Sequence, residues 1–584
     1  MLFLDHTVSV PSNGVTRVKR NHFIYVSELI DSWKTSDGSR NTNRRSKIIG
    51  RLVRAEPECN VMYPNEAYYE LHGLEKPAVN FAQISKPGRK CNTVYAEGAA
   101  IFPGFALLAA CALIDCQATS ILTQCFGQQL AEQIIFMATH YASGHTSLEC
   151  LDFHAMKHNV YKSARGLNAK NARELIANGL KSENIKAFFD KWLPAAAGDD
   201  AIAHDVTALP TQAKNITYAQ RGYAHGGPEL PQVNYALMCN CKTGMPLYYS
   251  SYYGSITDKK NLQHVIDSAI ERHLPGNLSL IFDRGFASKA NIEELTHKGI
   301  NFIMGVPGTF KGAMELLDAF TLENNTDFED LVLLEKLDGT ISEHGCRSKT
   351  VPFEYYGIKL NLHLYVNEEI NHDKSMELNH HIAHCLQIAR QTNQLPEDGY
   401  LKDARDCIIK EGKGKNITFR VDNEKYRKKK RKYGSFALFS SAQCNYNSHD
   451  ALRLFRNREI DEEIFNCLKT DLHLLPLRVW SNDAMHGKFF ILFISAIIRR
   501  HILQKTGDIL NMSRSSFNRL VTILENESVE LRGDGRFADM SVKSKIAQSV
   551  LCRFIDADKA RELGIKDSFV HKPKARSCAK KLKK

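Results

Sequence analysis

Residues 201–307 place strand-like and helix-like segments in an order that few folds accommodate. The runs AIAHDVTAL, QVNYALMCNC and MPLYYSSYYG have the composition of strands, and the turn CKTG between the second and third predicts a hairpin. A helix is predicted next, followed by a buried strand in LSLIFDRG, a helix that ends at Gly299 and a strand in INFIMGVP. The order β-β-β-α-β-α-β predicts an open mixed sheet with helices on its faces.

Two aspartates fall at positions where such a sheet presents side chains to ligands. Asp205 lies in the first strand and Asp283 at the end of the fourth, at the carboxyl edge where open α/β sheets bind their ligands. Gly285 is expected to permit the tight turn after Asp283. A single aspartate in such a place is more often a cap, a turn former or an ion-pair partner. His204 points to the opposite face of its strand and is interpreted as a packed core histidine.

A third acid is supplied by the stretch FRNREIDEEIFNCLKTDLH, residues 455–473. Wound as an α-helix, it carries on one narrow stripe Phe455, Arg458, Glu462 and Lys469. The opposite side carries Ile460, Ile464, Cys467 and Leu468, which predicts that this side is buried. Helix geometry alone does not distinguish Glu462 from Glu459.

Asp205, Asp283 and Glu462 together predict a site for hard metal ions. Three carboxylates that lie close together repel one another unless cations neutralise them. Oxygen ligands favour Mg²⁺ or Mn²⁺. Two such ions, roughly 3.5 to 4 Å apart, can activate a water or a 3′-hydroxyl and stabilise the leaving oxygen in a phosphoryl transfer.

Three basic runs without acids, at residues 40–54, 425–432 and 572–584, predict a polyanionic partner, although a single run would more often be a solvated surface. The formal charge of the 584-residue chain is +12, so the clusters are more informative than the total. The candidate contacts to DNA phosphates in the second run are Lys428, Lys429, Lys430 and Arg431. Arg284 is a further candidate, with pairing to a carboxylate as the alternative.

Other classes of protein find less support in the sequence. The 15 cysteines follow no regular framework, which indicates a reducing, cytoplasmic compartment, and no signal peptide is evident. The uncharged residues 98–114 contain Pro103 and are predicted to form a buried helix rather than a membrane span. GKGK at 412–415 lacks P-loop spacing, so no nucleotide cofactor is expected. NHHIAHC at 379–385 offers zinc-like i,i+4 pairs, but a solvated helix face is the favoured interpretation.

Changes of pattern along the chain predict five regions. They are a basic β-rich region at 1–95, a helical domain with a possible role in binding DNA ends at 96–192, a catalytic domain at 193–307 and 434–505, an insertion with its own strands at 308–433, and a C-terminal helical region with a basic tail at 506–584.

At the acidic and basic positions the chain resembles the bacterial insertion-sequence DDE transposases of the insertion-sequence-4 superfamily. Their signature of Tyr, Arg, Glu and Lys matches the spacing of Phe455, Arg458, Glu462 and Lys469, with Phe455 in place of the usual Tyr. DVT at Asp205 and DRGF at Asp283 resemble the other two acidic motifs. IIGRLV and MYPNEAYYELHG resemble the insertion-sequence-1634 group.

The resemblance implies a ribonuclease H-like fold in which Asp205, Asp283 and Glu462 hold the metal ions. It also implies that Arg458 and Lys469 contact phosphates, and that a homodimer assembles on double-stranded DNA, both terminal inverted repeats and target. The expected activity is metal-dependent strand cleavage followed by transfer of the 3′-hydroxyl. Two alternatives are a nuclease of the same fold that does not join strands, and a non-catalytic DNA-binding descendant.

Overall fold

The computed structural model describes residues 6–555 except 21–22, 35–41, 55, 57, 76–99, 102, 146, 165, 199–200, 223–229, 258–261, 263–278, 324–330, 333–345, 413–416, 459–463, 473, 475–476, 513–515, 528, 532–536 and 541–543. The chain divides into two compact units, residues 1–94 and 95–584. The basic tail at 572–584 lies outside the described residues.

In its described residues, the first unit is a five-stranded antiparallel sheet with a short helix, α1 (Glu66–Leu71). Its strands are β1 (Val8–Ser9), β2 (Val15–Arg20), β3 (Phe23–Lys34), β4 (Thr42–Leu52) and β5 (Val61–Pro64), in the order β1-β5-β4-β3-β2. Short strands were predicted here, but β3 and β4 extend over 12 and 11 residues. Ile24, Val26 and Met62 form the centre of a small core of their own.

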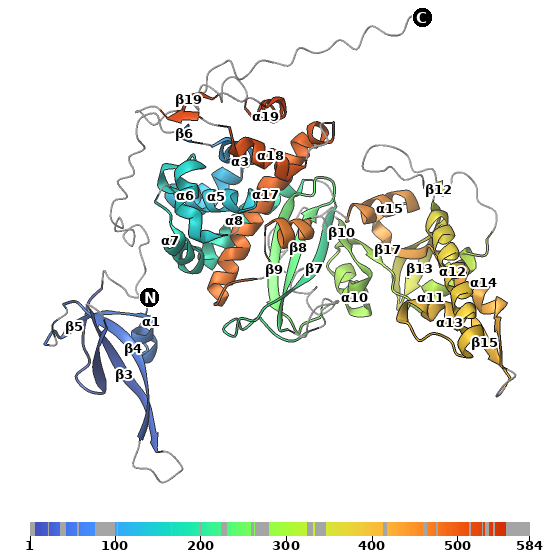
Figure 1. The fold of residues 1–584 in the computed structure, drawn as a ribbon, viewed down its shortest axis with the longest axis horizontal. Coiled ribbons are helices and arrows are strands. Elements are labelled where there is room, and N and C mark those ends of the chain that lie inside the picture. Colours follow the sequence, from blue (N-terminus) through green and yellow to red (C-terminus); the bar gives the residue numbers. More distant parts are fainter. Residues whose placement is uncertain are drawn as a thin grey trace, which may run out of the picture. The chain divides into compact units, whose positions relative to one another are not determined.

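The second unit begins with a group of helices, in agreement with the predicted helical pattern (Figure 1). They are α3 (Gly104–Asp115), α4 (Ala118–Phe126), α5 (Gln128–Ala142), α6 (Leu151–Lys157), α7 (Ala169–Glu174), the π-helix η3 (Leu175–Gly179) and α8 (Ser182–Ala197). The apolar stretch that contains Pro103 forms the buried helix α3, as predicted. No single described helix is long and apolar enough to cross a membrane; α3 and α4 pass such a test only as a pair, and they are bent by 84°.

Helices from the C-terminal part of the chain complete this core. The 31-residue helix α17 (Asn482–Met512) packs on α5 and η3, and α18 (Phe517–Glu525) packs on α3. Phe136, Trp192, Phe490 and Leu520 belong to one apolar cluster. A small sheet joins β18 (Val529–Leu531) to β6 (Ala100–Ile101) and β19 (Phe537–Met540), and α19 (Lys545–Leu551) follows, so the C-terminal region includes strands as well as the predicted helices.

The predicted mixed sheet is present, with every predicted strand in place. Strands β7 (Ile202–Pro210), β8 (Gln232–Asn240) and β9 (Pro246–Tyr253) form an antiparallel meander. On the other side of β7 lie β10 (Ser279–Phe282) and then β11 (Asn301–Gly305), both parallel to it. The helix predicted between β9 and β10 lies almost wholly outside the described residues, whereas α10 (Lys289–His297) ends before Gly299 at φ +66°, as expected.

Four further strands extend this sheet beyond β11. β17 (Ser435–Ser441), β14 (Ile358–Asn367), β13 (Cys346–Tyr355) and β12 (Leu331–Val332) give a nine-stranded sheet in the order β12-β13-β14-β17-β11-β10-β7-β8-β9. The strands at 346–367, which the sequence pattern assigned to the insertion at 308–433, therefore belong to the central sheet. Backbone pairing of β14 with β17 is a long-range contact, which strand composition does not reveal.

The segment that leaves the sheet runs from α12 (Glu368–Thr392) to α14 (Asn423–Lys432). It includes α13 (Lys402–Asp406) and the hairpin of β15 (Ile408–Glu411) and β16 (Thr418–Val421). It has its own apolar core, centred on Leu378, Cys385 and Leu401.

Alternation along the strands decides which helices cover each face of the sheet. Leu280 and Phe282 of β10 face the cluster that includes α10 and α11 (Lys311–Phe320). Ile281 faces the opposite side, where it meets Leu452 of α15 (Ser448–Asn457). Helix α15 thus lies against the face of the sheet that adjoins Asp205 and Asp283.

Candidate active site

Asp205 and Asp283 lie on neighbouring parallel strands at the same level of the sheet. Phe282 of β10 is in register with His204 of β7, so the next residues are the two aspartates. Asp205 lies within β7, and the N–H group of Val206 donates a hydrogen bond to its Oδ1 at 2.9 Å. Asp283 follows β10 directly and begins the turn η4 (Arg284–Phe286). Sheet geometry therefore brings together two acids that are 78 positions apart in the sequence, the difference between their numbers.

Helix α15 brings an arginine to both carboxylates. The side chain of Asn447 caps the helix by accepting from the N–H of Asp450, and the buried residues Ala451 and Leu452 fix it to the sheet. Arg458 follows the last residue of the helix. Its Nη1 lies 3.7 Å from Oδ2 of Asp205 and its Nη2 lies 3.7 Å from Oδ1 of Asp283. One guanidinium therefore bridges the two acids.

The bridge is electrostatic rather than tightly hydrogen-bonded. Both distances exceed the usual hydrogen-bond range, and the side chains of Asp205 and Asp283 remain 28% and 42% exposed. The Nε of Arg458 is buried without a partner in the part of the chain that the structure describes, and its guanidinium carbon lies 5.3 Å from the ring centroid of Phe455. Two accessible carboxylates that converge on one cation form an oxygen-only donor set, which fits a hard divalent ion.

Glu462 lies outside the described residues, as do Glu459 and the other residues of 459–463. The described helix before this gap ends at Asn457, and helical structure resumes at Ile464 and continues into the π-helix η8 (Cys467–Asp471). Ile464 and Leu468 are buried, as the periodicity predicted. Phe455 was predicted to lie on the side facing away from the core, but it is partly buried against the cluster that includes Leu452.

Lys469 lies on η8, beyond the gap. Its Nζ is 5.8 Å from the ring centroid of Phe465. The other basic candidate near the acids, Arg284, is exposed. Gly305 of β11 is packed against it, because a Cβ there would lie 2.9 Å from the backbone nitrogen of Arg284. Gly285 has open space around it and no positive φ, so the turn after Asp283 does not require the glycine that we expected it to need.

The basic helix α14 presents most, but not all, of its predicted cations to solvent. Lys428, Lys430 and Arg431 are exposed. Lys429 instead forms ion pairs with Asp403 at 2.8 Å and Asp406 at 2.9 Å. Burial lowers the pKa of Lys429, but the hydrogen bonds to these two aspartates outweigh that effect and raise it. A groove of about 930 Å³ beside the helix is lined by four basic side chains, Arg347, Arg427, Lys430 and Arg431, and also by Glu368 and Glu424.

Two predictions about histidines can be compared with the structure. His204 is 1% exposed and packs against the rings of Phe282 and Phe286, which confirms the core interpretation. Burial lowers its pKa to about 4, so it is neutral at pH 7. On α12, His380 and His384 are exposed, in line with a solvated helix face, while Cys385 is buried. A different histidine cluster, around His154, was not anticipated from the sequence.

The fold and the site define a class of protein, the mixed α/β proteins with paired carboxylates at the edge of the sheet. A family model described as "Transposase DDE domain" matches residues 196–498, which span the strands and helices that carry both aspartates and Arg458. This match covers more than half of the chain, so the chain belongs to the transposase DDE domain family. Members of this family take part in DNA transposition and generally use divalent metal ions.

Two other comparisons add little. A solved structure, the cryo-EM structure of a piggyBac transposase synaptic complex with hairpin DNA, is similar over 82% of this chain and 85% of that chain, with a TM-score of 0.35 and 10% sequence identity. This likeness is too weak to support an argument about the present chain. No curated protein matches the present chain.

Proposed function

We propose that this protein is a DNA transposase that cleaves strands at the ends of its element and joins the freed 3′-hydroxyl to target DNA. The observation that carries the proposal is the convergence of Asp205 and Asp283 on a single arginine within a transposase DDE domain. The bacterial insertion-sequence-4 superfamily, and its insertion-sequence-1634 group, is the proposed affiliation. A ribonuclease H-like architecture for the catalytic domain is supported by the order β9-β8-β7-β10-β11, an antiparallel meander followed by two parallel strands.

Asp205, Asp283 and Glu462 are the proposed ligands of two Mg²⁺ or Mn²⁺ ions. Bound between these oxygens, the ions would lower the pKa of the attacking hydroxyl or water and stabilise the leaving oxygen. The carboxylates remain accessible, and the positive charge that now balances them comes from one side chain. Glu462 lies outside the described residues, four positions after Arg458 and two positions before Ile464 in the sequence.

Arg458 is proposed to contact a DNA phosphate during the reaction. A guanidinium is a rigid fork that suits a phosphate as well as a pair of carboxylates. When the negative charge of Asp205 and Asp283 is balanced by metal ions, the guanidinium no longer has to neutralise them and can pair with the DNA backbone. The Phe455 ring beside it restricts its orientation. Lys469 is proposed as a second phosphate contact.

The exposed cations of α14 are proposed to extend the DNA-binding surface. Lys428, Lys430 and Arg431 face solvent, whereas Lys429 is proposed to position the helix through Asp403 and Asp406. Double-stranded DNA binds such surfaces by releasing counterions, which makes the affinity strongly salt-dependent. Assembly as a homodimer on two element ends is part of the proposal, as is the cytoplasmic, nucleoid-associated location.

The test is a strand-transfer assay with purified full-length protein and DNA that carries the sequences flanking its gene. Wild-type protein is expected to cleave and to join strands only when Mg²⁺ or Mn²⁺ is present. Asp283→Asn should abolish both steps without loss of DNA binding, while Asp373→Asn, an exposed aspartate on α12, should behave as wild type. Cleavage without joining would point instead to a nuclease, and binding without any cleavage to a non-catalytic descendant.

A further inference from the structure

Four histidines gather in the helical part of the second unit, away from the carboxylate site in the fold. His140 lies near the end of α5, His145 in the following loop, His154 on α6, and His158 caps that helix. Ring centroids are 5.5 Å apart for His140 and His145, 4.7 Å for His140 and His154, 4.8 Å for His145 and His154, and 4.8 Å for His154 and His158. Such a density of imidazoles offers several nitrogen ligands within one small volume.

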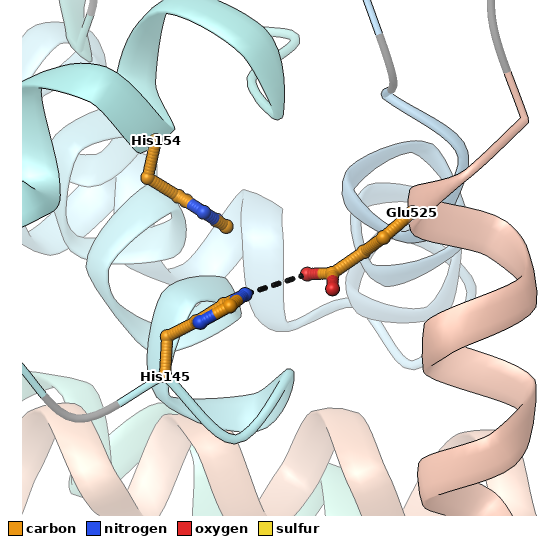
Figure 2. A group of neighbouring side chains, drawn as sticks. All are labelled: His145, His154 and Glu525. Carbon is orange, nitrogen blue, oxygen red and sulfur yellow. Dashed lines mark hydrogen bonds and ion pairs between the residues drawn. The ribbon is translucent and has the colours of Figure 1, made fainter.

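A carboxylate from a distant part of the chain joins this group. Glu525 is the last residue of α18, and its Oε1 lies 3.1 Å from Nε2 of His145. One ligand atom from each of His145, His154 and Glu525 lies within 4.8 Å of the other two. Figure 2 shows the three side chains converging from the loop after α5, from α6 and from the end of α18. The group therefore links positions 380 residues apart in the sequence.

The hydrogen bonding of the buried His140 leaves one of its ring nitrogens available to bind a metal ion. His140 is 2% exposed, and its Nε2 lies 3.2 Å from the carbonyl oxygen of Ser147, so this nitrogen carries the proton and donates. Its Nδ1 then has a free lone pair, and that atom is buried without a hydrogen-bond partner in the described part of the chain. Neutral imidazoles are the form that binds metal ions.

Apolar packing alone does not account for this group. Phenylalanine would fill the same space between helices without leaving a buried lone pair unsatisfied. The half-exposed His145 also directs its Nε2 at Oε1 of Glu525, at 3.1 Å, so a nitrogen and an oxygen ligand atom already face each other.

We propose that His145, His154 and Glu525 bind one zinc ion, with Nδ1 of His140 or a water molecule as the fourth ligand. Imidazole and carboxylate ligands in this combination suit Zn²⁺. Ligand atoms around a tetrahedral zinc ion lie roughly 3.3 Å apart. The present separations of up to 4.8 Å would shorten through rotation of the half-exposed side chain of His145. The ion would fasten α18 to α5 and α6, and it would be separate from the catalytic ions.

The test is a metal titration of full-length protein that has been stripped with a chelator. Excess Mg²⁺ is kept present to occupy the carboxylate site, and Zn²⁺ or Co²⁺ is then added. Wild-type protein is expected to bind one equivalent of Zn²⁺, to give intense visible Co²⁺ absorption typical of tetrahedral nitrogen ligation, and to melt at a higher temperature when Zn²⁺ is bound. His154→Asn and Glu525→Gln should each weaken binding at least about tenfold.

Matched variants make the result decisive. His384→Asn removes an exposed histidine from α12 and should bind Zn²⁺ as wild type does. Glu525→Gln keeps the shape of the side chain at the end of α18, so it remains informative if His154→Asn does not fold. Equal zinc affinity in wild type and Glu525→Gln would overturn the proposal, as would a Co²⁺ spectrum dominated by thiolate charge transfer, which would assign the ion to cysteines.

Discussion

Two glycines of α17 allow the packing of the helical core to be tested with a matched pair of substitutions. Gly487 is buried against the π-helix η3, and a Cβ there would lie 1.9 Å from the carbonyl oxygen of Ile176 and 2.8 Å from its carbonyl carbon. Gly507 belongs to the same helix, but a Cβ there would have nothing within 4 Å. Gly487→Ala and Gly507→Ala therefore make the same chemical change in opposite surroundings.

The two variants share one energetic effect and differ in another. Alanine in a helix interior is more stable than glycine by about 0.5–1 kcal/mol, so Gly507→Ala should stabilise the protein by that amount. Gly487→Ala gains the same propensity but must move two backbones apart by more than 1 Å to reach the closest tolerable contact of 3.0 Å. Overpacking of this kind costs about 1–3 kcal/mol or more. The difference between the variants isolates that cost.

Urea unfolding followed by the fluorescence of Trp192 measures both effects in the helical core, where this side chain is 1% exposed. Trp33→Phe and Trp480→Phe in the background remove the other tryptophans. Gly487→Ala should unfold at a lower urea concentration than the parent protein, and Gly507→Ala at a higher one. Equal midpoints for the two variants would refute the close packing of α17 on η3.

Two further outcomes follow from individual charges. Burial lowers the pKa of Lys488 from 10.5 to about 8, so the unfolded chain binds more protons than the folded protein between these pH values. The free energy of unfolding should therefore rise as the pH increases from 8 to 10.5. Urea unfolding across this range measures the rise, which Lys488→Met should remove. Lys428→Ala and Arg431→Ala together should weaken DNA binding uniformly across sequences and reduce the log–log salt slope by about 0.9 per lost phosphate contact. Lys429→Ala should change the slope less, because the Lys429 ammonium is held by Asp403 and Asp406. Fluorescence anisotropy at several salt concentrations measures both slopes, and a larger loss of DNA affinity from Lys429→Ala would contradict the assignment of Lys429 to these ion pairs.

Local pattern was sufficient to predict the central sheet between residues 201 and 307. The alternation in β7 and the uninterrupted apolar run of β10 follow from which faces are buried, and both segments are bounded by turn residues. The same pattern could not place β13 and β14, because β14 pairs with β17, about 70 to 80 residues further along the chain, and β13 joins the sheet through β14. Long-range pairing leaves no trace in composition.

The candidate site shows a similar division. The carboxyl edge of the sheet predicted that Asp205 and Asp283 should be close, and their shared contact with Arg458 agrees with that prediction. The direct bridge by Arg458 was not anticipated, because helical periodicity orders residues within one helix but does not fix where that helix docks. The cluster of His145, His154 and Glu525 was also missed, since its carboxylate comes from a helix near the other end of the chain.

Binding of Mn²⁺, followed by electron paramagnetic resonance of the free ion, tests the metal site most directly. Wild-type protein is predicted to bind Mn²⁺, and Asp205→Asn, Asp283→Asn and Glu462→Gln should each weaken that binding, while Asp373→Asn should not. Mn²⁺ binding that is unchanged in all three acid variants would contradict the proposal that these residues form one metal site.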